Sequence, residues 1–245
     1  MARLFDDSGS DQYLSVGTAA VTAEPLTIAA WLRPDDDAAE QTAVSISNGS
    51  GSDGKWALQA RMNFTGNPVS ALKEDDSNNF SRPNASGLVV NEWHHGAAVF
   101  TSNTSRTAYM DGGNKTTATT NIADPSANNT AVGGSLNSTF QRNFSGDIAE
   151  VGIWNVALTD DEIAALAAGF SPLLIRPSAL VGYWPVIGRN SPEIDLTGKT
   201  GAMTLTNSPA VADHPRILMP VSQQIITAPA VPSQINTAAR RRAVS

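Results

Sequence analysis

The alternation of polar and apolar side chains is clearest at residues 55–62, which read KWALQARM. In an extended chain Trp56 and Leu58 point to one side, while Gln59 and Arg61 point to the other, because successive side chains alternate across a strand. Such a segment is typical of a half-buried strand with one face on a core. The sequence therefore predicts a β-sheet with a polar outer face at this point.

Similar strand patterns occur on both sides of this segment, separated by turn residues such as DGGN at 111–114. In the last pattern, the spacing places Ile148 on the face opposite to Val151 and Ile153. Many short strands joined by turns indicate an all-β fold, a two-sheet antiparallel sandwich. The expected strands are residues 26–32, 55–62, 93–101, 106–110, 131–134 and 147–154.

One short helix is expected at residues 159–167. Thr159 and Glu162 have the spacing of a capping box, in which each side chain accepts a hydrogen bond from the other's backbone N–H. Gly169 fits the residue that ends such a helix, because it tolerates a left-handed backbone.

The strand patterns also predict where the tryptophans lie relative to the core. Trp31, Trp93 and Trp154 lie in strand patterns beside apolar residues, so we expect all three between the two sheets. Replacing any of them with alanine is expected to cost about 3–5 kcal/mol. Trp184 precedes Pro185 and is expected to be partly exposed.

Composition excludes several classes of function. The 245 residues suffice for one sizeable domain. A net charge of −7 and a pI near 4.9 argue against nucleic-acid binding, which needs a basic surface. The absence of cysteine excludes disulfides, thiolate metal sites and cysteine nucleophiles. No apolar run is long enough for a membrane span, and the acidic start lacks an apolar leader, so we expect synthesis in a cytoplasm.

Residues 214–245 differ in character from the rest of the chain. They contain no acidic residue and carry +4, whereas residues 1–213 carry −11. Their proline- and alanine-rich composition predicts no packed core. We expect an extended basic tail that attaches to another subunit or to an acidic patch of the domain; the alternative is a disordered tail. The residues expected to make the attachment are Arg216, Ile225, Ile226, Arg240, Arg241 and Arg242.

Several segments, taken in order, resemble the laminin-G-like family of concanavalin A-like jelly rolls. The resemblance covers about residues 3–170. It implies a jelly-roll sandwich with one short helix, followed here by the extended tail. The segments are DQYLSV at 11–16, PLTIAAWLRP at 25–34, EWHHGA at 92–97, YMDG at 109–112, FSGDIAEVGIWN at 144–155 and TDDEIAAL at 159–166.

The region after the helix resembles the segment that usually begins such a domain. It reads LVGYWP at 180–185, DLTG at 195–198 and MTLT at 203–206. We expect a permuted order, in which residues 180–212 supply the opening strand segment of one domain spanning residues 1–213. The alternative is the start of a truncated second repeat. In a permuted domain, residues 180–212 should pair with residues 3–16.

Catalytic groups are not evident, and the protein is expected not to be an enzyme. Asp147 and Glu150 are three residues apart, so on a regular strand they point to opposite faces and cannot flank one glycosidic bond. His94 and His95 are adjacent and point to opposite faces of a strand, so they cannot easily share a metal. The resemblance to the family implies structural roles for both.

The resemblance leaves calcium binding open, because domains of this family often bind calcium through a loop aspartate and backbone carbonyls. The candidate ligand loop consists of Asp75, Asp76, Asn78 and Asn79, which lack the spacing of an EF-hand loop. A solvated acidic turn is the alternative. No other cofactor is expected.

Two functions remain for such a domain. The first is a structural accessory protein on a large assembly, foremost a decoration or cement protein on a bacteriophage virion. Its partners would be a major capsid protein or further copies of itself, and its location the virion surface, with the cytoplasm as the alternative. The second is a lectin-like module that binds glycans, for example on a host surface. Neither function involves nucleic acid or a membrane.

Overall fold

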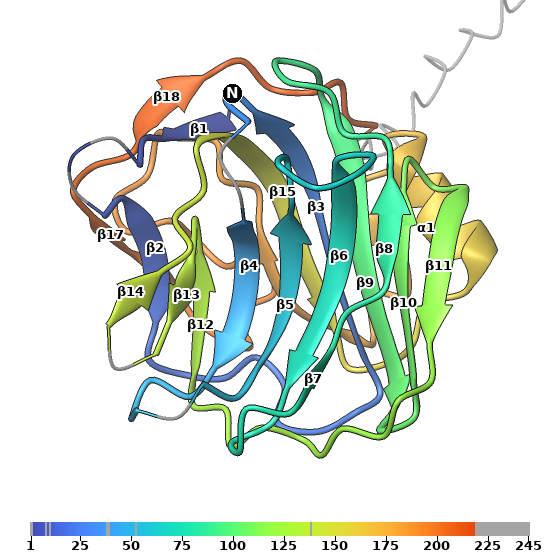
Figure 1. Ribbon diagram of the computed structural model, residues 1–245. Helices are drawn as coiled ribbons and strands as arrows, with labels where there is room; N and C mark the ends of the chain where they lie inside the picture. The colour runs from blue at the N-terminus through green and yellow to red at the C-terminus, as the bar shows by residue number, and fades with distance from the viewer. Residues whose placement is uncertain are drawn as a thin grey trace, which may run out of the picture.

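Two antiparallel sheets stacked face to face form the body of the protein (Figure 1). The computed structural model describes residues 2–7, 9, 11–37, 40–51, 53–137 and 139–218. We call the sheet nearer the viewer in Figure 1 the front sheet and the other the back sheet. The arrangement confirms the predicted all-β jelly-roll sandwich.

Each main sheet has eight strands. The back sheet runs, in spatial order, through β11 (Asn114–Ala118), β10 (Ser105–Met110), β9 (His94–Ser102), β3 (Leu26–Pro34), β15 (Gly146–Trp154), β1 (Ala2–Phe5) and β18 (Ala210–Ala212), with β16 (Leu180–Trp184) also paired to β15. The front sheet runs through β17 (Thr204–Thr206), β2 (Tyr13–Val16), β12 (Asn129–Val132), β4 (Gln41–Ser47), β5 (Lys55–Ala60), β6 (Pro68–Glu74) and β7 (Phe80–Ser81), with β8 (Asn84–Ser86) also on β6. A separate ribbon consists of β13 (Ser135–Leu136) and β14 (Phe140–Gln141).

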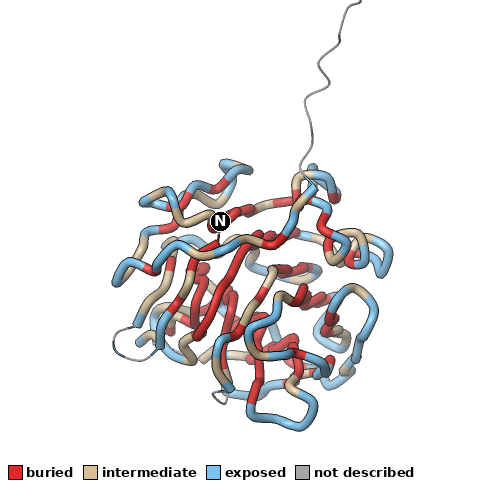
Figure 2. Tube along the Cα trace, turned by 90° about the horizontal axis from the view of Figure 1, so that it is seen from above, coloured by how far each residue is buried: buried red, intermediate tan, exposed pale blue. Residues whose placement is uncertain are grey.

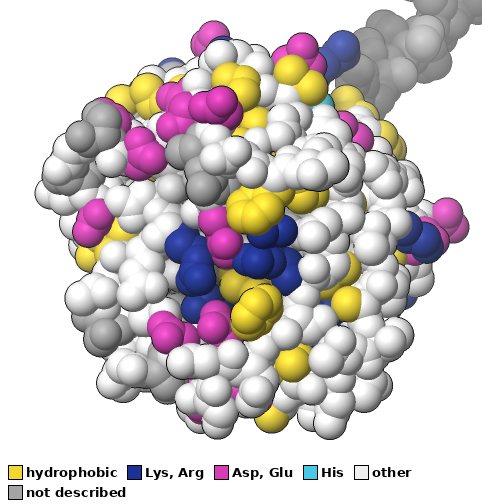
Figure 3. All heavy atoms as spheres, viewed as in Figure 1, with side chains coloured by type: hydrophobic (Ala, Val, Ile, Leu, Met, Phe, Trp, Pro, Cys, Tyr) yellow, Lys and Arg dark blue, Asp and Glu magenta, His cyan; other side chains and the backbone are white. Residues whose placement is uncertain are grey.

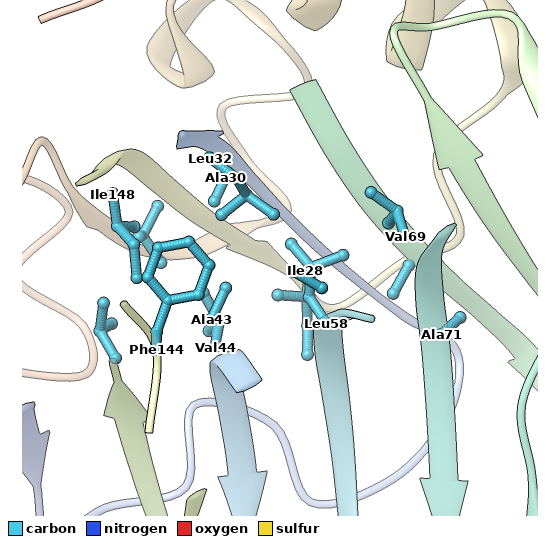
Figure 4. Close-up of a cluster of buried hydrophobic side chains, with 14 of the residues drawn as sticks. Ile28, Ala30, Leu32, Ala43, Val44, Leu58, Val69, Ala71, Phe144 and Ile148 are labelled. Carbon is cyan, nitrogen blue, oxygen red and sulfur yellow. The ribbon is translucent and has the colours of Figure 1, made fainter. Parts of the chain in front are cut away.

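Apolar side chains fill the space between the sheets. In β5, Trp56 and Leu58 are fully buried in this core, as the alternation predicts. Figure 4 shows side chains of the two sheets meeting, among them Ile28 of β3 and Leu58 of β5. Seen from above, the buried segments run through the middle of the molecule and exposed loops surround them (Figure 2). Burial of these side chains provides the main driving force for the fold.

The short helix α1 (Asp160–Ala167) covers part of the outer face of the back sheet, and the 3₁₀ turn η1 (Pro172–Leu174) follows it. The predicted capping box is present, with the Thr159 N–H donating to Glu162 at 2.8 Å. Ile163 and Leu166 are buried in a second apolar cluster on this face. Among the described residues, no helix is long and apolar enough to cross a membrane.

Strand β15 contains a bulge at Glu150, whose φ of 56° is left-handed. The bulge inserts an extra residue and thereby reverses the alternation of the residues that follow it. Ile148, Val151 and Ile153 therefore all point into the inter-sheet core. The prediction that Ile148 faces away from the other two was wrong for this reason.

The tryptophans do not occupy the predicted positions. Trp31 and Trp93 are only partly buried, and Trp154 is fully buried in the cluster beneath α1 rather than between the sheets. The inward positions of β3 belong to its aliphatic residues, so Trp31 points outward. Trp56 and Trp184 instead lie in the inter-sheet core, and Trp184 is fully buried rather than partly exposed.

The C-terminal segment is part of the same sandwich as the N-terminal one. Strand β17 pairs with β2, and β18 pairs with β1, where Ala2 stands opposite Ala212. Strand β16 pairs with the part of β15 that follows the bulge. Residues 180–212 thus pair with residues 3–16, as a permuted domain requires, while the permuted origin itself stays a prediction.

A short segment, residues 213–218, follows β18, and we call it the strap. Its last residue, Leu218, forms backbone hydrogen bonds with Gly169 and Ser171 next to α1. The His214 Nε2 atom lies 3.1 Å from the buried carboxylate of Glu150. The strap therefore holds the end of the described chain against the back of the molecule.

His95 on β9 gives the fold a predicted pH dependence. Its side chain is 2% exposed and packs edge-on against Trp31. Burial lowers the pKa of His95 to about 4, an effect that the nearby Asp111 only partly opposes. An unfolded chain, with a histidine pKa of about 6.5, therefore binds the proton more readily. The free energy of unfolding should fall as the pH drops from about 6.5 to about 4, by up to about 1.4 kcal/mol per pH unit.

Urea unfolding at several pH values between 7 and 4 measures this slope directly. A His95→Gln variant, which cannot titrate, should show a flatter dependence over the same range. Equal slopes for the two proteins would contradict the assignment to His95.

Candidate functional site

The outer face of the front sheet is polar and recessed. Gln59 of β5 stands in register between Thr42 of β4 and Ser70 of β6, and all three point away from the apolar core. They are nevertheless fully buried, because loops and longer side chains cover the face. A row of hydrogen-bonding groups therefore lies beneath the surface here.

A hollow of about 230 Å³ opens on this face, and we call it the front groove. Leu72 of β6 and Phe80 of β7 supply its apolar surface, and the remaining side chains are charged. A larger hollow of about 630 Å³ lies at the rim of the sandwich, where Tyr13 and Phe140 stack on each other. The front groove is the better candidate site because charged and aromatic groups converge in it. Its lining residues are Glu40, Leu72, Glu74, Phe80, Arg82 and Arg142.

Glu40 is the centre of the polar contacts in the front groove. Its Oε1 atom accepts a hydrogen bond from Gln59 at 3.1 Å and lies 3.2 Å from the Nε atom of Arg142. A terminal nitrogen of Arg82 contacts the same oxygen and also donates to the amide oxygen of Gln59 at 3.3 Å. One carboxylate thus holds two guanidinium groups side by side.

Two exposed aromatic rings accompany the arginines. Phe80 is 55% exposed, with the guanidinium of Arg82 5.5 Å from the centre of its ring. Phe64 is 39% exposed and lies against the guanidinium of Arg61 at 3.4 Å. Phe80 is therefore an exposed apolar surface directly beside charged hydrogen-bonding groups.

At the lower end of the front groove, Lys55 and Glu74 form an ion pair at 2.6 Å. Lys55 is fully buried and also donates to the backbone carbonyl of Asp53 at 2.7 Å. Figure 3 shows basic side chains gathered near the centre of the front sheet, with acidic and hydrophobic groups between and beside them. No comparable basic cluster is visible elsewhere in this view.

The candidate calcium loop lies directly beside the front groove, since it precedes Phe80. The Asp75 carboxylate accepts hydrogen bonds from the backbone of Ser77 and Asn79, and Asp76 accepts from the backbone of Ser126. Both carboxylates therefore accept backbone hydrogen bonds, Asp75 within its own turn and Asp76 from a segment distant in the sequence. In the part of the chain that the structure describes, no three histidine or acidic side chains gather where they could hold a metal ion.

The carboxylates considered for hydrolysis are placed differently from the prediction. Because of the bulge in β15, Asp147 and Glu150 both lie on the outer face of the back sheet, not on opposite faces. Each is already engaged: Asp147 pairs with Arg33 at 2.8 Å, and Glu150 accepts from the Tyr183 hydroxyl at 2.6 Å. The arrangement is a set of structural contacts.

The adjacent histidines also have structural partners. His94 contacts the Asp111 carboxylate at 2.8 Å, and its other ring nitrogen accepts from the backbone of Val89. Of the predicted attachment residues, Arg216 is exposed in the strap, while Ile225, Ile226, Arg240, Arg241 and Arg242 lie outside the described residues.

Sequence reasoning missed most of the front groove. The alternation at residues 55–62 predicted that Gln59 and Arg61 share the polar face of the strand. Glu40, Arg82 and Arg142 come from three separate connections, before β4, after β7 and after β14, and no sequence motif links them.

The two stacked antiparallel sheets define the protein as a jelly-roll domain. A family model described as the concanavalin A-like lectin/glucanases superfamily (Laminin_G_3) matches residues 7–164, and the chain belongs to this family. No curated protein matches the sequence.

Three solved structures illustrate the likeness of the fold. A putative carbohydrate binding protein from Bacteroides ovatus is 16% identical, with a TM-score of 0.59 over 86% of this chain and 61% of that one. The CBM40 domain of the Ruminococcus gnavus IT-sialidase, bound to α2,3-sialyllactose, is 17% identical, with a TM-score of 0.56 over 68% of this chain and 98% of that one. A heptameric SAP-like pentraxin from Limulus polyphemus is 12% identical, with a TM-score of 0.55 over 68% of this chain and 80% of that one.

Proposed function

We propose that the protein is a non-catalytic, lectin-like module that binds glycan in the front groove. The observation that carries the proposal is the exposed Phe80 ring beside convergent donors and acceptors from Glu40, Arg82 and Arg142. A sugar ring offers an apolar face of C–H groups and a rim of hydroxyls, so it needs both kinds of surface. The volume of the groove is below the usual range for a drug-sized ligand and suits one sugar unit at the end of a chain.

The charges in the groove favour binding rather than bond cleavage. Glycoside hydrolysis commonly requires one carboxyl group to donate a proton while a second acts as base or nucleophile. Glu40 contacts two arginines and Glu74 contacts Lys55, so both carboxylates of the groove are already engaged in ion pairs. The names of the solved relatives, a carbohydrate binding protein and a CBM40 domain, agree with a binding role.

A Phe80→Ala variant should bind glycan at least tenfold more weakly than the unaltered protein, because the ring provides the exposed apolar surface of the groove. A glycan array identifies the ligand, and isothermal titration of the strongest hit measures the change in affinity. Phe170→Ala is the matched control, since Phe170 is 41% exposed near α1, away from the groove. Equal losses in the two variants, or binding unaffected in Phe80→Ala, would overturn the proposal.

A second proposal concerns attachment to a large assembly, such as a virion surface, through the C-terminal tail. The observation that favours it is the strap, which leads the chain along the back of the molecule, on the side opposite the front groove. A protein truncated after Leu218 should keep its glycan affinity and its fold but lose attachment. Full occupancy of the assembly by the truncated protein would contradict this role.

A further inference from the structure

The front groove stands out from the rest of the protein by its charge. Residues 1–213 contain 12 lysines and arginines against 23 acidic residues, which gives −11. Three of these arginines, Arg61, Arg82 and Arg142, nevertheless gather on one face of one sheet. A local excess of positive charge in such a groove favours the binding of anions over neutral molecules.

The groove contains more positive charge than its own carboxylates balance. Lys55 and Glu74 neutralise each other at 2.6 Å. Glu40 supplies one negative charge for both Arg82 and Arg142. Within the described part of the chain, Arg82 and Arg142 each contact Glu40 through one nitrogen of the guanidinium, which leaves other N–H donors for a ligand.

Arg61 adds a further cation, which forms no ion pair with the residues that the structure describes, although the more distant charge of Glu40 favours its charged form. Its contacts within the described residues are with the amide oxygen of Asn84, at 3.2 Å, and the ring of Phe64. The residue is only 6% exposed, and its Nε atom has no hydrogen-bond partner among the residues that the structure describes. Burial, with the charge of Arg82 as a second cause, lowers the pKa of Arg61 below its usual range. A nearby anion would relieve this unfavourable electrostatic environment.

We propose that the front groove selects sugars that carry a carboxylate, which Arg82 and Arg142 bind while Arg61 supplies additional positive charge. This inference rests on the proposed glycan-binding function and adds the chemical class of the ligand. The planar guanidinium group matches a carboxylate in geometry and forms paired, charge-assisted hydrogen bonds with it. Leu72 and Phe80 would contact the sugar ring that bears the acid.

Matched pairs of glycans test the charge requirement on the full chain. The probes are α2,3-sialyllactose against lactose, and a galacturonate trisaccharide against its methyl ester, with a 6-sulfated galactoside as a separate arm. We expect one acidic probe to bind at least tenfold more tightly than its neutral partner by isothermal titration. Raising the salt concentration should weaken this binding, because the site is partly open to solvent.

Arginine variants then test which side chains bind the carboxylate of the glycan. Arg142→Met and Arg82→Met should each weaken binding of the acidic probe at least tenfold and remove most of its advantage over the neutral partner. Arg176→Met is the matched control, because Arg176 is paired with Glu162 beside α1 and should alter affinity less than twofold. Arg142 is partly exposed, so its replacement keeps the test valid even if the Arg82 variant is less stable.

The outcomes separate this inference from the proposed function. Neutral glycans that bind as tightly as acidic ones, with a loss in Phe80→Ala, would refute the carboxylate selectivity and leave glycan binding intact. Preference for the sulfated probe would refute the carboxylate as the recognised group. Binding of none of the array glycans would overturn both.

Discussion

Replacing Trp184 with alanine should lower the free energy of unfolding by about 3–5 kcal/mol. The indole is fully buried in the inter-sheet core, and its N–H donates to the backbone carbonyl of Gly201 at 3.0 Å. Its ring lies over Gly182, where a Cβ atom would approach the ring to 2.4 Å. Removal of the ring would therefore leave both a cavity and an unsatisfied carbonyl group.

Urea unfolding monitored by circular dichroism measures this change. Gly182→Ala is an independent second variant, because its methyl group would displace the same ring, and it should also destabilise the protein. A loss below about 1 kcal/mol for Trp184→Ala would show that β16 and the residues after it contribute little to the core.

Replacing Asp195 with alanine should lower the free energy of unfolding by about 3–4 kcal/mol. Its carboxylate accepts hydrogen bonds from the backbone N–H groups of Tyr183, Thr197, Thr200 and Gly201, and from the Thr197 hydroxyl. These bonds hold the loop between β16 and β17 in place. Without the carboxylate, several N–H groups would lose their acceptor in a largely buried environment.

The same contacts predict that the stabilisation of the fold by Asp195 is lost in acid. Burial alone would raise the pKa of Asp195, but the hydrogen bonds from Tyr183, Gly201 and Thr197 outweigh it and lower the pKa below its usual value of 3.8. The stabilisation is therefore present above about pH 4 and is lost as the pH falls further, through the lowered pKa. Asp195→Asn, which keeps one acceptor oxygen, should recover part of the loss seen with alanine. Equal stability of wild type and Asp195→Ala would contradict this account.

Local patterns in the sequence predicted the strands and the helix but not where each side chain points. The alternation at residues 55–62 and the capping box of Thr159 and Glu162 depend only on neighbouring residues, and both are present in the structure. The bulge at Glu150 could not be predicted, because a left-handed backbone usually requires glycine or asparagine. Because of that single irregularity, Ile148 shares a face with Val151 and Ile153, and the two carboxylates of β15 share the other.

The front groove could be predicted only in part for a related reason. Gln59 and Arg61 belong to a regular strand pattern, so their common face followed from spacing. Arg82 and Arg142 lie in connections whose course depends on tertiary packing, and their shared contact with Glu40 is created by the fold. Candidate residues chosen for their acidity, such as Asp75, are instead used to stabilise their own turn.

The pairing of β1 with β18 determines how the domain would respond to a mechanical load. Ala2 and Ala212 stand opposite each other at one end of this antiparallel pair. A force that separated the two strands at this end would break their hydrogen bonds one after another. The strap lies between that point and the rest of the chain. A pull on the C-terminal side would first load the backbone bonds of Leu218 and the contact of His214 with Glu150. The strap thus shields the β1–β18 pair from tension applied at that end.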